Sequence, residues 1–159
     1  MKLYGDTLSP FVRMCLVTAH EVGLGTKIQR EISRVDPTTV NAGLAAVSPV
    51  GKVPVLVTDH NHAIYDSRVI IEYLCHVSGN KTLIPDDGVK RFRVLTVAAL
   101  GQAIAEAGVA WRYETAVRPQ GLQWHYPFQP SFPASRAHIN NGKRVCHRSC
   151  FVYRSISMY

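Results

Sequence analysis

The spacing of hydrophobic positions changes several times along the first 35 residues, and each spacing predicts a different element. Leu3-Tyr4 is a short apolar run typical of a strand. After a loop that contains a glycine, apolar residues recur at helical spacing, at Val12, Cys15, Leu16, Ala19 and Val22. Gly23 or Gly25 ends this helix, and residues 27–32 predict a second strand. Strand, helix and strand in this order indicate a parallel crossover.

The next segments extend this layer. Residues 41–47 predict a short helix, and residues 53–57 are a β-branched run that contains a proline. After turn-forming residues, 63–65 predict an antiparallel partner strand. Residues 67–77 predict a helix whose inward positions are Ile70, Leu74 and Val77. The order βαβαββα predicts an α/β thioredoxin-like domain over residues 1–80.

A helical pattern follows this domain. Residues 81–88 hold a proline, two acids and a glycine, and we interpret them as a linker. Residues 89–118 predict one long helix with two apolar sides, the first at Phe92, Leu95, Ala99 and Ala103 and the second at Leu100, Ile104 and Trp111. Such a helix is typically covered by other helices or by a second subunit. With a further helical turn predicted at 120–124, we assign residues 89–124 to a partial, truncated all-α domain.

The last 35 residues have a different composition. Prolines recur every third residue at 127, 130 and 133, and residues 125–159 contain five basic side chains and no acid. This segment therefore contributes +5 of the net charge of +7, and residues 1–124 contribute only +2. We interpret residues 125–159 as an irregular or disordered basic tail. Its arginines and aromatic residues leave nucleic-acid binding as an alternative that we do not favour, because no recognised nucleic-acid-binding motif accompanies them.

Composition also bears on compartment and metals. The chain begins without the basic and apolar plan of a secretory signal, and no run of about 18 consecutive apolar residues predicts a membrane span. We therefore expect a cytoplasmic protein without a membrane partner. Of the four cysteines, Cys15 and Cys75 fall in apolar helical stretches, and Cys146 and Cys150 lack a second pair at zinc-binding spacing. We predict no metal.

Three residue pairs stand where an extended segment meets a turn or a helix. Ser9-Pro10 is a common helix start, but a hydroxyl beside free N–H groups and the positive end of a helix dipole also suits an anion such as a thiolate. Val53-Pro54 is either the start of an edge strand or a cis bond that turns main-chain groups toward a bound peptide; the sequence does not fix the isomer. Asp66-Ser67 is a helix cap that could also hold the amino and carboxylate groups of an amino acid.

Residues 1–124 resemble a bacterial glutathione S-transferase, most strongly over the first 80 residues. The resemblance is carried by residues 3–13 (LYGDTLSPFVR), 48–56 (SPVGKVPVL) and 65–74 (YDSRVIIEYL). Asp66 stands where this family more often has glutamate or glutamine. The resemblance implies a homodimeric detoxification enzyme that joins glutathione, its co-substrate, to a small electrophile.

The resemblance also implies roles for individual residues. Ser9 would be the hydroxyl that activates the thiol, and the Val53 main chain, next to cis-Pro54, would pair with the cysteinyl part of glutathione. Asp66 and Ser67 would hold the γ-glutamyl end, and Lys52 would lie near the glycyl carboxylate.

Two alternatives use the same fold. A thiol–disulfide oxidoreductase needs a cysteine at the helix start, where this chain has Ser9, and Cys15 lies nearly two turns further on. Disulfide exchange through a protein cysteine is therefore not expected, although reduction through glutathione itself stays open. The second alternative is a glutathione-binding or dimerisation module without turnover.

The resemblance and the helical pattern both end after Trp124. This change suggests a frame-altered coding sequence or a wrongly joined gene. This hypothesis predicts that one alternative reading frame past codon 124 encodes further helical sequence of the family. Sequencing the encoding DNA tests this hypothesis. If neither alternative reading frame past codon 124 encodes helical sequence of the family, the hypothesis is wrong.

Overall fold

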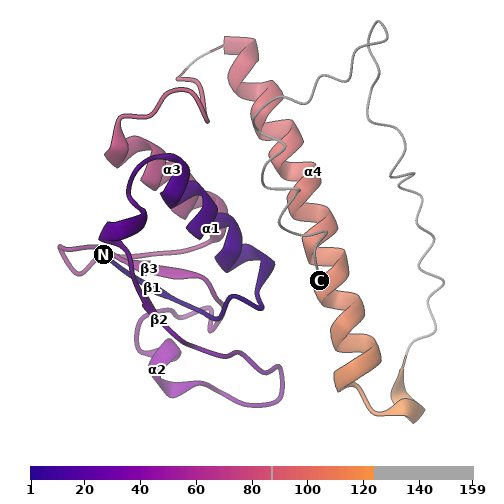
Figure 1. Ribbon diagram of the computed structural model, residues 1–159. Helices are drawn as coiled ribbons and strands as arrows, with labels where there is room; N and C mark the ends of the chain where they lie inside the picture. The colour runs from indigo at the N-terminus through magenta and orange to yellow at the C-terminus, as the bar shows by residue number, and fades with distance from the viewer. Residues whose placement is uncertain (87, 124–159) are drawn as a thin grey trace, which may run out of the picture.

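The computed structural model describes residues 1–86 and 88–123 of the 159-residue chain. Its first part is a thioredoxin-like α/β layer (Figure 1). The elements, in chain order, are β1 (Lys2–Tyr4), α1 (Pro10–Glu21), β2 (Gln29–Glu31), α2 (Ala42–Ala45), β3 (Val55–Val57), β4 (Ala63–Ile64) and α3 (Ser67–Ser78). A 3-10 turn at Gly25–Lys27 precedes β2. The predicted order βαβαββα is thus confirmed.

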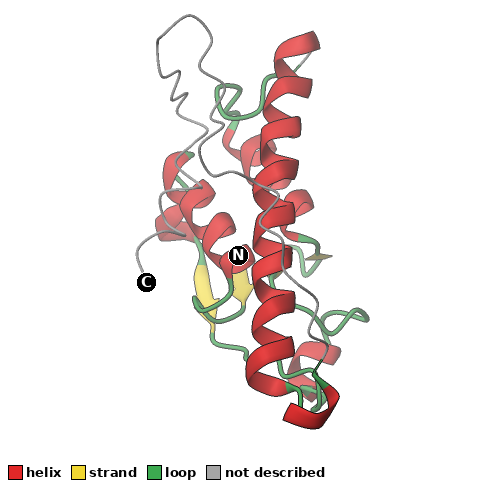
Figure 2. Cartoon of the chain, turned by 90° about the vertical axis from the view of Figure 1, so that its right-hand side faces the viewer, coloured by secondary structure: helices red, strands yellow, loops and turns green. Residues whose placement is uncertain are grey.

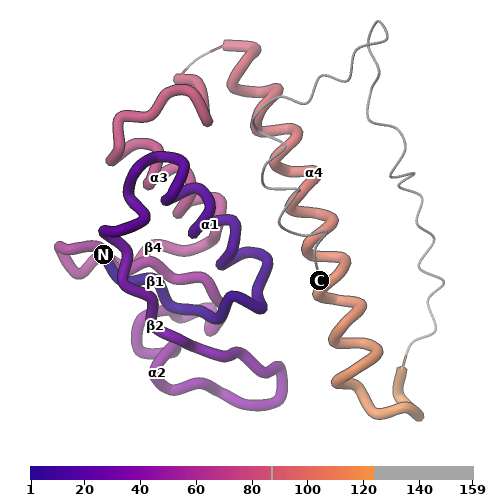
Figure 3. Tube along the Cα trace, in the orientation of Figure 1, coloured from indigo at the N-terminus to yellow at the C-terminus, as the bar shows by residue number. Residues whose placement is uncertain are grey.

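The four strands form one mixed sheet in the order β2-β1-β3-β4 (Figure 3). β1 pairs with β2 in parallel and with β3 antiparallel, with Tyr4 opposite Val55. β3 pairs antiparallel with β4, with Leu56 opposite Ile64. The predicted parallel crossover and the antiparallel return strand are both present.

The core lies between the sheet and the two long helices of this layer. Its buried members come from β1, α1, β3 and α3 and from the turn after α1: Leu3, Val12, Cys15, Ala19, Leu24, Leu56, Ile70 and Leu74. The stripe predicted for the first helix supplies three of these residues. α1 and α3 pack against each other, and Figure 1 shows α2 on the opposite side of the strands.

The second strand and the inward face of α3 differ from the prediction. β2 is limited to Gln29–Glu31, because the chain still turns through Gly25–Lys27. Val77 does not point inward, since its side chain is 48% exposed. The buried positions of α3 are Ser67, Ile70, Leu74 and Cys75. Near the end of the helix the buried face therefore includes Cys75 and not Val77.

The helical region consists of α4 (Gly88–Arg112), a π-helical turn at Tyr113–Val117 and a 3-10 turn at Gln120–Leu122. α4 runs alongside the α/β layer, packs against α1 and extends past it (Figures 1 and 2). Its buried positions are Gly101, Gln102 and Ala105, which lie on neither predicted apolar side. Each predicted apolar side has an exposed large residue, with Phe92 68% and Leu100 44% exposed.

The helical stretch Gly88–Val117, 30 residues long, is long and apolar enough to cross a membrane by length and composition alone. Mostly buried core helices of soluble proteins pass the same test, but only 17% of the tested window is buried here. The absence of a membrane partner stays a prediction. The proposed tail at 125–159, with Cys146 and Cys150, lies outside the described residues.

Candidate functional site

Sheet topology gathers the three residue pairs at one edge of the sheet. β1 ends at Tyr4, opposite Val55 at the start of β3. β4 runs antiparallel to β3 and ends at Ile64, opposite Leu56. The residues after β1, before β3 and after β4 therefore leave the sheet at the same edge, and these residues include Ser9, Val53-Pro54 and Asp66-Ser67.

Ser9 is the N-cap of α1, and Pro10 follows as the first helical residue. Its backbone is extended, with φ −76° and ψ 123°, and its Oγ accepts a hydrogen bond from the Val12 N–H at 3.4 Å. This bond is long compared with the usual 2.7–3.2 Å. Because the hydroxyl oxygen acts here as an acceptor, its hydrogen is free to donate to another group. Ser9 is half-buried, so such a group can approach from outside.

Gly5 ties the start of α1 to the segment before β3. Its φ of +144° lies in a region that favours glycine, and a Cβ there would come within 2.4 Å of Val12 Cγ2 and 3.3 Å of Val53 Cβ. Only a residue without a side chain allows these groups to approach so closely. The Val12 side chain, in the first turn of α1, and the Val53 Cβ thus both lie close to this one glycine.

The Val53–Pro54 peptide bond is cis, which fixes the isomer that the sequence left open. Pro54 is buried and stands directly before β3, so it removes no hydrogen bond from the strand ladder. No residue in the described part of the chain hydrogen-bonds with the Val53 main chain. Its N–H and C=O are therefore available to an extended peptide. The preceding Lys52 is exposed.

Asp66 is the N-cap of α3, where its Oδ1 accepts the Arg68 N–H at 2.7 Å. The Arg68 guanidinium also donates to both carboxylate oxygens, at 3.3 and 3.2 Å. Partial burial raises the pKa of Asp66, but hydrogen bonds and charge from Arg68, with a smaller effect of Lys52, outweigh it and lower the pKa below its usual range. Asp66 is thus a carboxylate at neutral pH, and Lys52 is close enough for its charge to act on it. Ser67, next to it, is 3% exposed.

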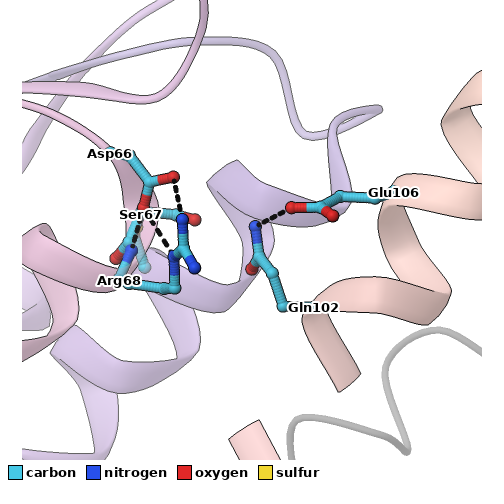
Figure 4. A network of polar contacts seen from close by, with 6 residues as sticks. Asp66, Ser67, Arg68, Gln102 and Glu106 are labelled. Atoms are coloured by element: carbon cyan, nitrogen blue, oxygen red, sulfur yellow. Dashed lines mark hydrogen bonds and ion pairs between the residues drawn. The ribbon is translucent and has the colours of Figure 1, made fainter. Parts of the chain in front are cut away.

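A polar pair on α4 faces this helix start, and the sequence analysis missed it. Gln102 Nε2 donates to Glu106 Oε1 at 3.1 Å, and Figure 4 shows the pair opposite Asp66, Ser67 and Arg68. The Glu106 charge helps to raise the pKa of Arg68, after the larger effects of Asp66. The available signal was two polar residues four positions apart within an otherwise apolar stretch.

Cys15 lies beneath the site and takes no nucleophilic position. It is fully buried, and its Sγ donates to the Ser67 carbonyl at 3.7 Å. Burial first, and the Asp66 charge second, raise the pKa of the Cys15 thiol far above its usual value, so it stays protonated.

Cys75 is buried as well. In residues 1–86 and 88–123, no three His, Cys, Asp or Glu side chains gather to hold a metal ion. The absence of a metal stays a prediction.

Comparison with known proteins bears on this arrangement. The family described as "Glutathione S-transferase, N-terminal domain" matches residues 8–77. An uncharacterized GST-like protein, YibF of Escherichia coli K12, is 35% identical over 123 residues, which cover 77% of this chain and 58% of YibF.

Solved structures agree with this match. A glutathione transferase family member from Pseudomonas fluorescens Pf-5, with bound glutathione, is 39% identical with a TM-score of 0.75, over 77% of this chain and 60% of that one. A glutathione S-transferase from Methylobacillus flagellatus, also with glutathione bound, is 34% identical with a TM-score of 0.64, over 78% and 59%. The chain spans about three fifths of the length of these relatives. By its sequence match and its fold, the amino-terminal part of this chain is an N-terminal domain of the glutathione S-transferase family.

Proposed function

We propose that this chain binds glutathione at the sheet edge described above and transfers its sulfur to a small electrophile, with Ser9 stabilising the thiolate. The observation that carries the proposal is the position of the Ser9 hydroxyl. It caps α1 at the edge where the Val53 main chain has no partner among the described residues, within a domain of the glutathione S-transferase family.

Hydrogen bonding and the helix dipole are sufficient to ionise the thiol. A free thiol with a pKa of about 8.5 is only roughly 3% ionised at pH 7. One hydrogen bond to a charged sulfur contributes about 1.5–3 kcal/mol, and a helix start adds about 0.3–1 kcal/mol. At about 1.36 kcal/mol per pKa unit, these effects lower the pKa by roughly one to three units.

In this mechanism Ser9 is a hydrogen-bond donor and not a base. The thiol proton leaves to water, and the Ser9 hydroxyl donates to the resulting thiolate. The sulfur then forms a bond to an electrophilic carbon, and the electron pair of the broken or shifted bond goes to the leaving group or acceptor atom of that substrate.

The remaining predicted residues hold the peptide. Asp66 would accept hydrogen bonds from the α-ammonium of the γ-glutamyl end, while Ser67 and the α3 start would hold its carboxylate. The Val53 main chain would pair with the cysteinyl part as an added strand does. Lys52, exposed beside this segment, would lie near the glycyl carboxylate.

The rest of the proposal concerns the whole protein. We propose a cytoplasmic homodimer in which the apolar sides of α4 are covered, since Phe92 and Leu100 are exposed in the single chain. The same exposure favours one alternative, a glutathione-binding module without turnover. We expect α4 to line the side on which the electrophile binds, and uncovered residues there would leave that side incomplete. Conjugation of a reactive aryl halide by the full chain separates the two functions.

Calorimetry on the full chain tests the binding step. Glutathione at millimolar concentration is expected to give measurable heat, and Asp66→Asn is expected to weaken binding roughly tenfold or more, because a charge-assisted hydrogen bond contributes about 1.5–3 kcal/mol. Asparagine keeps the capping oxygen, so the loss reports on the charge. The control is Asp59→Asn, which removes a carboxylate next to the amino terminus at the opposite sheet edge. No heat from glutathione with folded protein would end the proposal.

A further inference from the structure

Asp6, in the loop that carries Ser9, makes three contacts that fix the loop. Its carbonyl oxygen accepts the Ser9 N–H at 3.0 Å. Its Oδ1 accepts the Leu8 N–H at 3.0 Å, and its Oδ2 accepts a hydrogen bond from Arg34 Nε, also at 3.0 Å. Asp6 thus holds the main chain of Leu8 and Ser9 at the end of the loop. It also joins the loop to Arg34, which is distant in the sequence.

The contact with Arg34 joins the loop after β1 to the segment after β2. Arg34 belongs to the segment after β2, 28 positions along the chain, and its own side chain is 80% exposed. The Asp6 side chain is only 19% exposed, so its carboxylate is the enclosed partner of the ion pair. The Leu8 N–H first, and Arg34 second, lower the pKa of Asp6. The contact is therefore present at neutral pH and is lost only in acid, as pH falls through that lowered pKa.

The Ser9 side chain is restrained less than the main chain on either side of it. Its hydrogen bond with Val12 is long at 3.4 Å and restrains the side chain only weakly. The main chain on either side is fixed more strongly, by Pro10 on the helix side and, on the loop side, by the Asp6 carbonyl bond to Ser9 and the Asp6 carboxylate bond to Leu8. A donor held within about 0.5 Å of its productive place needs such support from neighbouring residues.

We propose that Asp6 is a positioning residue for Ser9 and that Arg34 supports it through the ion pair. This inference rests on the proposed function. Asp6 does not touch the sulfur; it sets the loop geometry so that the Ser9 hydroxyl donates to the thiolate. Loss of Asp6 then raises the pKa of the bound thiol while glutathione keeps its contacts with Val53 and Asp66.

The test measures the ultraviolet absorbance of bound thiolate against pH, with glutathione affinity measured in parallel. Asp6→Ala is expected to reduce the thiolate fraction at neutral pH several-fold and to change affinity, measured below the thiol pKa, by less than twofold. Asp6→Asn keeps an acceptor for the Leu8 N–H but loses the charge that pairs with Arg34, so it is expected to restore only part of the thiolate. Asp59→Asn is the matched control and is expected to leave the pH profile unchanged.

A double variant separates positioning from a direct effect. If Asp6 acts through Ser9, then adding Asp6→Ala to Ser9→Ala raises the thiol pKa no further. Fully additive effects, or an unchanged profile in Asp6→Ala, would overturn the inference. A Ser9→Ala variant with an unchanged profile would instead refute the proposed function. Should Asp6→Ala not fold, Arg34→Ala replaces it, because that side chain is on the surface, and an unchanged profile there counts against the inference in the same way.

Discussion

Replacing Ser9 with alanine is expected to raise the pKa of glutathione bound to this chain by about one to two units, because one hydrogen bond to a charged sulfur contributes about 1.5–3 kcal/mol. The helix start remains in the variant, so part of the stabilisation of the thiolate remains. The measurement is the dependence on pH of the bound thiolate absorbance and, where the chain turns over, of kcat/KM. Both curves should shift to higher pH together.

Two further variants distinguish this role from helix capping. Ser9→Ala also removes the N-cap of α1, a loss that costs about 0.5–2 kcal/mol of stability. Asn80→Ala removes comparable local hydrogen bonds, to Thr82 and Leu83, away from the site, and should lower stability without moving the pH profile. Ser9→Thr keeps a hydroxyl and should retain most of the effect. A pH profile that does not move in Ser9→Ala removes Ser9 from the mechanism.

The fold of the first 80 residues could be predicted because local pattern and global topology agree there. The stripe that includes Val12, Cys15 and Ala19 has helical spacing and is buried in the structure. The alternation of strands and helices then allows few arrangements of the sheet. The prediction failed at Val77, since periodicity alone does not show how the buried face of a helix turns near its end.

The candidate site could be predicted in part. Helix-start chemistry points to Ser9 and Asp66 because capping residues have strong local preferences. The cis bond before Pro54 could not be predicted, because the isomer depends on tertiary context. Asp6 was missed because an aspartate in a loop is ordinary turn chemistry, and its contact with Arg34 joins positions far apart in the chain.

The helical region shows where sequence pattern is least informative. Its apolar residues predicted the covered sides of α4, but the face turned to the α/β layer holds Gly101, Gln102 and Ala105. Small and polar residues at that face allow close approach to α1 and place the Gln102–Glu106 pair opposite α3. On the apolar sides, Phe92 and Leu100 stay exposed.

Leu74→Ala is expected to lower the free energy of unfolding by about 2–5 kcal/mol, the cost of deleting a large aliphatic side chain from a packed core. Leu74 is fully buried on α3, in the cluster that also contains Leu3 and Leu56 of the sheet. Since small domains are stable by only about 5–15 kcal/mol, this loss is a large part of the total. Urea denaturation followed by far-ultraviolet circular dichroism measures it.

Val69→Ala on the same helix is the matched control, because its side chain is 53% exposed and should change stability by less than about 0.5 kcal/mol. Equal losses in the two variants would mean that α3 does not pack on the sheet through Leu74. The comparison also concerns function: the same core fixes α1 relative to α3, and Ser9 and Asp66 are the N-caps of these helices. Glutathione affinity in Leu74→Ala should therefore fall in proportion to the unfolded fraction, and added glutathione should restore part of the lost stability, because a ligand that binds only the folded state stabilises it.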